Sequence, residues 1–144
     1  MTSSSWSDAR REAADAQAAR AARLRADEVT QARELVAGFV AEAVRRHLAT
    51  SSLQVRAGDS RDTYRSGLVG WYLRRDGSLA IAEDGEMYVL TAPRSLRSRF
   101  SGVTLTPTDP RLQAGIGARD GESVALATLL ELRLAAGDDW PIVR

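Results

Sequence analysis

The feature that most constrains this chain is a helical pattern that runs without a break across residues 8–49. Apolar residues recur every three or four positions along one stripe: Ala22, Ala26, Val29, Ala32, Val36, Phe39 and Ala43. This spacing keeps the stripe on one face of an α-helix. A straight helix over these residues would be roughly 63 Å long, about twice the diameter of a small domain. The sequence therefore predicts a helix that projects beyond the body of the protein.

The N-terminal half of this helix differs in composition from its C-terminal half. Residues 13–26 are mostly alanine and arginine and contain few large side chains that could be buried. We therefore divide the chain into a helical extension, residues 1–26, and a single domain, residues 27–144. Trp6 has no intramolecular partner evident in the sequence, so it is either a contact for a partner or part of a free end.

Beyond the helix, the apolar period changes from about four to two, which indicates strands. Two Asp-Gly pairs, Asp76-Gly77 and Asp84-Gly85, lie eight residues apart between alternating runs. Asp-Gly is typical of two-residue type I′ turns, which need a positive φ at both central residues. The sequence therefore predicts a three-stranded antiparallel meander with strands at residues 68–75, 78–83 and 86–91.

Two-residue turns fix a register that pairs Tyr72 with Ile81 and Ile81 with Tyr88. In this register one face of the meander is uniformly apolar, and the other carries an apolar middle between charged ends. A solvated face does not carry so much aromatic and aliphatic area, so we expect a helix, the N-terminal extension or another subunit to cover it. The predicted partner-binding residues are therefore Tyr72, Ile81, Tyr88, Leu90 and Trp6.

The remaining segments complete an α+β prediction. Residues 57–66 are expected to form a surface loop, residues 102–106 a further strand, and residues 122–136 a helix with Asp120 as N-cap and Gly137 as stop signal. Trp140 must either pack back onto the domain or contact a partner. The predicted fold is a long N-terminal helix, an antiparallel sheet of about four or five strands with the meander at its centre, and a C-terminal helix packed on the sheet.

The composition excludes several kinds of chemistry. Cysteine, lysine and asparagine are absent, and His47 is the single histidine. The chain therefore has no thiolate nucleophile, Cys–zinc site, Schiff-base lysine or P-loop lysine. His47 lies near the expected end of the first helix, where it favours the helix dipole. We expect no catalytic residue, no metal ion and no cofactor.

The arginines indicate an alternative function, the binding of nucleic acid or phosphate. Arg94, Arg97 and Arg99 form the densest basic segment, and with Arg74 and Arg75 they are the predicted anion-binding residues. They would contact phosphates of a nucleic acid or another anionic ligand. The competing interpretation is that they pair with an acidic partner or with the chain's own carboxylates.

The overall prediction is a non-enzymatic protein–protein interaction module, such as an adaptor, a chaperone-like factor or an assembly component, with a homodimer as the simplest assembly. The formal net charge of +1 argues against a basic field over the whole molecule. The lysine-free, alanine-rich composition is typical of a GC-rich bacterium. The start of the chain shows no signal peptide, and the longest apolar run, residues 35–41, is too short to span a membrane, so we expect a cytoplasmic protein.

Overall fold

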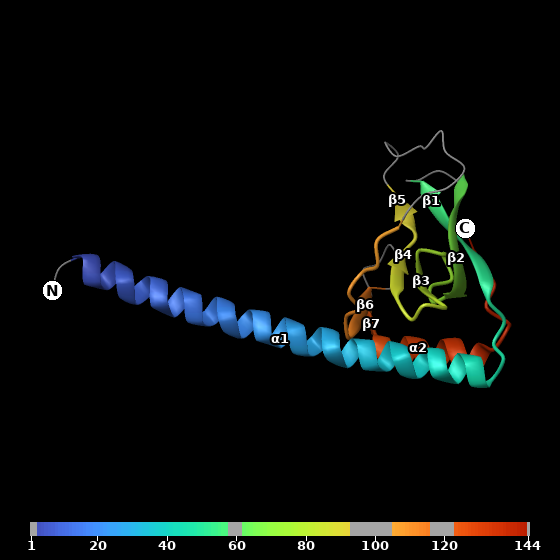
Figure 1. Ribbon diagram of the computed structural model, residues 1–144, viewed down its shortest axis with the longest axis horizontal. Coiled ribbons are helices and arrows are strands. Elements are labelled where there is room, and N and C mark those ends of the chain that lie inside the picture. The colour runs from blue at the N-terminus through green and yellow to red at the C-terminus, as the bar shows by residue number, and fades with distance from the viewer. Residues whose placement is uncertain (1–2, 58–61, 93–104, 116–122, 144) are drawn as a thin grey trace.

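The computed structural model describes residues 3–57, 62–92, 105–115 and 123–143. Two helices and seven strands follow one another in the order α1 (Ser3–Arg45), β1 (Ser51–Ala57), β2 (Thr63–Tyr72), β3 (Leu79–Ala82), β4 (Met87–Val89), β5 (Thr91–Ala92), β6 (Gln113–Gly115), β7 (Ser123–Ala125) and α2 (Leu126–Ala136). The predicted α+β class, with a long N-terminal helix and a C-terminal helix, is confirmed (Figure 1).

The main sheet has the strand order β4-β3-β2-β1-β5. The first four strands in sequence are antiparallel neighbours, so the predicted meander is the outer part of a longer one. β5 pairs parallel to β1, which makes the sheet mixed rather than wholly antiparallel. β2 begins at Thr63, within the segment expected to be a loop. The expected strand at residues 102–106 lies mostly outside the described residues.

The predicted register of the meander is wrong by one residue. Trp71 pairs with Ile81, and Ile81 pairs with Met87. The physical reason is the backbone at the turns, where Gly77 and Gly85 have positive φ values of 76° and 84° but the preceding aspartates do not. Type I′ turns need two such residues, and a single glycine in this conformation favours longer loops.

The β3–β4 turn shows how the shift arises. The amide of Ala82 donates to the carbonyl of Glu86, and the amide of Gly85 donates to the carbonyl of Ala82. These bonds enclose a three-residue loop with its glycine in the left-handed region, the type I turn with a bulge that is common in hairpins. The extra residue moves Ile81 opposite Met87, on the same face of the sheet as Trp71.

The first core lies between the two helices and one face of the sheet (Figure 1). The stripe predicted for α1 is buried at Ala32, Val36, Phe39 and Ala43, and α2 contributes Leu126 and Leu130. These side chains pack on the face formed by Trp71, Leu73, Leu79, Ile81 and Met87. The rings of Phe39 and Trp71 meet edge to face with their centres 5.8 Å apart, which locks the C-terminal half of α1 to the sheet.

The second core lies on the opposite face of the sheet. It contains Leu53, Val55, Tyr72, Ala80, Ala82, Tyr88 and Leu90. Leu105 and two residues of the C-terminal segment, Trp140 and Ile142, pack against it. The amide of Val143 donates to the carbonyl of Arg75 at 2.6 Å and ties the same segment down. The chain therefore covers its own second face, and Trp140 packs back onto the domain.

Both helices end at a left-handed residue. At the end of α2 this residue is Gly137, with φ of 59°, as predicted. α2 starts at Leu126 rather than near residue 122, because residues 123–125 pair with β6, and the expected N-cap Asp120 lies outside the described residues. At the end of α1, His47 has φ of 54°; its amide donates to Val44 and that of Leu48 donates to Ala43, which is the Schellman arrangement.

We expect His47→Gly to stabilise the protein. Glycine enters the left-handed region without the penalty that a Cβ atom imposes, so the free energy of unfolding should rise by about 0.5–1 kcal/mol. Thermal unfolding would measure the change, with His47→Ala as the control, because alanine removes the imidazole but keeps the Cβ atom. An equal rise for both variants would contradict the backbone explanation.

Candidate interaction surface

The first 25 residues of α1, residues 3–27, are all exposed. This segment, called the free arm below, extends away from the body for about 37 Å at the usual helical rise (Figure 1). The free arm carries two large apolar side chains that are exposed to solvent, Trp6 at 60% and Leu24 at 70%. The guanidinium carbon of Arg10 lies 5.5 Å from the centre of the Trp6 ring, within cation–π range.

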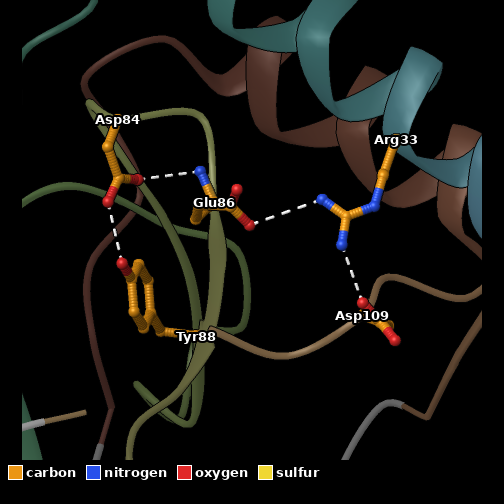
Figure 2. Close-up of polar contacts among 5 residues, drawn as sticks. All are labelled: Arg33, Asp84, Glu86, Tyr88 and Asp109. Atoms are coloured by element: carbon orange, nitrogen blue, oxygen red, sulfur yellow. Dashed lines mark hydrogen bonds and ion pairs between the residues drawn. The ribbon is translucent and has the colours of Figure 1, made fainter. Parts of the chain in front are cut away.

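Contacts between α1 and the body begin at Glu28. The Glu28 carboxylate accepts a hydrogen bond of 3.2 Å from the amide of Leu112. One turn later, Arg33 donates to Asp109 at 2.7 Å and lies 3.5 Å from a carboxylate oxygen of Glu86 (Figure 2). Two segments far apart in sequence, the β3–β4 hairpin and residues 109–112, therefore meet α1 next to its buried stripe. These contacts fix the point at which the free arm leaves the body.

The hairpin that supplies Glu86 is ordered by its own polar contacts. Asp84 accepts a hydrogen bond from the amide of Glu86 and another from the Tyr88 hydroxyl, both at 2.8 Å (Figure 2). Burial, followed by the bond to the Asp84 carboxylate, raises the pKa of Tyr88 to about 12. The hydroxyl therefore remains a donor at neutral pH, and the hairpin presents Glu86 to α1 in a fixed position.

Four of the five predicted partner-binding residues are inside the protein. Tyr72, Ile81, Tyr88 and Leu90 are all less than 10% exposed, the first, third and fourth in the second core and Ile81 in the first. The sequence alone leaves open whether a helix, the N-terminal extension or another subunit covers the second face of the meander. In the structure, other residues of the same chain cover it. These four side chains therefore present no surface to a partner in this structure, whereas Trp6 does.

Of the five predicted anion-binding arginines, the structure describes Arg74 and Arg75. Arg94, Arg97 and Arg99 lie outside the described residues. Arg74 is half-buried and donates to the Ser78 hydroxyl at 3.2 Å, and its pKa is lowered by burial. Arg75 is exposed, and its guanidinium carbon lies 5.7 Å from the centre of the Trp140 ring. Both described arginines are thus engaged with the chain's own side chains.

Two of the hollows in the described part of the chain involve residues of the body. One, of about 420 Å³, is lined by His47 and Glu83 among others, but no hydrogen bond joins His47 to a carboxylate within the described chain. The other, of about 470 Å³, lies where the free arm meets the body and is lined by Arg25, Ala26, Glu28, Val29, Asp109 and Arg111. Glu28 and Asp109 are already engaged with Leu112 and Arg33.

Sequence reasoning missed the residues that join the segments. None of Glu28, Arg33 and Arg133 is singled out by the sequence. The signal for Glu28 and Arg33 was their position beside the buried stripe, but nothing in the sequence identifies Leu112 or Asp109 as their partners. Across the described residues, no group of three or more potential ligand side chains could hold a metal ion, and no helix is long and apolar enough to cross a membrane.

No protein-family model, curated protein or solved structure matches this chain. Its function must therefore be argued from its own residues.

Proposed function

We propose that this chain is a non-enzymatic protein–protein interaction module whose partner-binding element is the free arm of α1. The observation that carries the proposal is the exposure of every residue from 3 to 27 in a helix that continues from the core without interruption. Isolated helices are marginal in water, but the body nucleates this one and thereby spares it the cost of the first turn. The arm therefore reaches a partner already folded, which lowers the entropy lost on binding.

The location forms part of the same proposal. The lysine-free, alanine-rich composition supports an origin in a GC-rich bacterium, and a cytoplasmic location is proposed with it. The alternative of nucleic-acid or phosphate binding rests on Arg94, Arg97 and Arg99. A steep fall in nucleic-acid affinity with salt would favour it over the arm.

Removing the free arm tests whether it serves binding rather than folding. We expect a chain that starts at residue 27 to keep its cooperative transition, with a melting temperature lowered by less than about 3 °C, because the removed residues bury almost nothing. Circular dichroism during heating measures this. Loss of the cooperative transition would show that the arm belongs to the folding unit and would contradict the proposal.

Photo-crosslinking of the full chain tests the binding itself. A photo-reactive residue at Ala13, on the arm, should give adducts of discrete mass in the native host. The same residue at Thr128, an exposed position on α2, is the matched control. Adducts from Ala13 that disappear when unlabelled full-length chain competes, but persist when the chain starting at residue 27 competes, support the arm. Adducts from Thr128 alone would overturn it.

A further inference from the structure

One face of the free arm carries a stripe of residues whose order of small and charged side chains is nearly symmetric about its middle. Taken at steps of three and four along the helix, the stripe is Ala9, Glu12, Ala16, Ala19, Arg23 and Ala26. At 100° per residue these six positions lie on one side of α1, on average about 160° away from the buried stripe Ala32, Val36, Phe39 and Ala43. All six are exposed. A second helix could therefore lie along this stripe on the side away from the body, reaching the body only near Ala26, which also lines the hollow at the junction.

The charges of this stripe are complementary to those of a second copy that runs in the opposite direction. In an antiparallel pair in which residue i faces residue 35 − i, Glu12 meets Arg23 of the other copy, and Arg23 meets its Glu12. Ala16 then faces Ala19, and Ala9 faces Ala26, so small side chains separate the charges and allow a close approach of the helix axes. A parallel pair would instead place like charges together, which is destabilising. The charge order thus selects both the partner and its direction.

The charges that would pair are free in the single chain. Within the described residues, the ion pairs of α1 involve Arg33, Glu42, Arg45 and Arg46, whereas Glu12 and Arg23 have no partner within 4.0 Å. A contact between two copies would therefore replace no existing ion pair. The two-fold arrangement uses the same surface on both copies, as closed dimers do.

We propose that a second copy of this chain occupies the stripe, and that two free arms pair antiparallel about a two-fold axis between residues 17 and 18. This inference rests on the proposed function, because it names the partner of the free arm. The cross-arm pairs Glu12–Arg23 set the register, and the two bodies lie at opposite ends of the paired helices.

Charge reversal in the full chain tests the pairing. Sedimentation equilibrium should show a dimer whose dissociation constant rises about tenfold or more in Glu12→Arg and in Arg23→Glu, because each change turns two attractive contacts into repulsive ones. An equimolar mixture of these two variants should recover the association, since every cross-arm contact is again between opposite charges. Arg25→Glu is the matched control, because it makes the same charge change on the opposite side of the helix and should leave the constant unchanged.

Cysteine crosslinking tests the direction, since the chain has no cysteine of its own. Antiparallel pairing predicts a disulfide between Ala9→Cys in one copy and Ala26→Cys in a size-tagged second copy. It predicts none between two copies of Ala9→Cys, whose residues would lie about 26 Å apart along the axis. Ala9→Cys homodimers, or equal weakening by Arg25→Glu and Arg23→Glu, would overturn the proposal.

The same measurements separate this inference from the proposed function. A chain that stays monomeric at several hundred micromolar, but whose arm still crosslinks to another protein, overturns the antiparallel dimer alone. A monomeric chain with no arm-dependent adduct overturns both.

Discussion

Gly70→Ala should destabilise the protein by about 3 kcal/mol or more. Gly70 lies in β2, the strand that has β1 on one side and β3 on the other, and it pairs with Ser51 and Ala82. A Cβ atom at this position would collide with the carbonyl oxygen of Ile81 and lie 2.6 Å from the Cα atom of Ala82. Both contacts are with backbone, so relief requires β2 and β3 to separate. Thermal unfolding should show the midpoint lowered by about 10 °C.

Gly38→Ala is the matched control for this prediction. Gly38 lies inside α1, is exposed, and has no neighbouring atom within 4 Å of the position that a Cβ would take. Alanine restricts the unfolded chain and favours the helix, so the free energy of unfolding should rise by about 0.5–1 kcal/mol. If both glycines tolerate alanine equally, the close approach of β2 to β3 is not a feature of the folded protein.

The parts of the fold that the sequence predicts are those with a local cause. The stripe of α1 is periodic over many turns, so its buried face at Val36 and Phe39 follows from spacing alone. The existence of the meander follows from alternation and from glycines that can take a positive φ. Gly137 stops α2 for the same local reason. In each case neighbours along the chain decide the outcome.

The register of the meander and the cover of its second face depend on less local causes. Asp84-Gly85 suits both a two-residue turn and a three-residue loop, and the choice between them moves every side chain of the next strand. The cover of Tyr72 and Tyr88 comes from residues near the C-terminus, which carry no periodic pattern. An apolar face of a sheet predicts that other residues cover it, but it does not predict which residues these are. In this structure the cover comes from the chain itself, through Leu105, Trp140 and Ile142.

The candidate site shows the same division. Exposure of the free arm follows from its composition, since alanine and arginine offer little to bury. Trp6 is predicted as a contact for a different reason, because the polar sequence around it offers no intramolecular partner. The position along α1 at which contacts with the body begin could not be predicted. Glu28 contacts Leu112 and Arg33 contacts Asp109, and the two residues of each pair are more than 70 positions apart in the sequence. Such contacts depend on where the irregular segment before β6 passes α1.

Arg133→Met is the second substitution with a large expected effect. Arg133 is buried, and its guanidinium donates to the carbonyl of Tyr72 at 2.8 Å and to the carbonyl of Gly137 at 2.6 Å. Its guanidinium carbon also lies 5.5 Å from the centre of the Trp140 ring. Burial lowers the pKa of this guanidinium, and the carboxylate of Asp138 partly opposes that effect. Methionine keeps much of the apolar stem but removes the two hydrogen bonds that the guanidinium donates to these carbonyls, so we expect a loss of about 2–4 kcal/mol.

Two further variants isolate the cause of that loss. Arg133→Lys keeps the charge but cannot make both hydrogen bonds and stack on Trp140, so its stability should fall between those of the wild type and Arg133→Met. Glu131→Met, an exposed position on the same helix, should change stability by no more than about 0.5 kcal/mol.

Hydrogen exchange then tells whether Arg133 holds the C-terminal segment or only the end of α2. Because Trp140 packs between this arginine and the second core, losing the guanidinium should release residues 138–143 together. The amide of Val143, which donates to Arg75, should exchange faster in Arg133→Met under conditions where the amides of β3 remain protected. Release of this segment would uncover Tyr72 and Tyr88, so the variant should also bind a hydrophobic dye before it unfolds. Equal protection of Val143 in the wild type and the variant would confine the role of Arg133 to capping α2, and Trp140 and Ile142 would then cover the second core without its help.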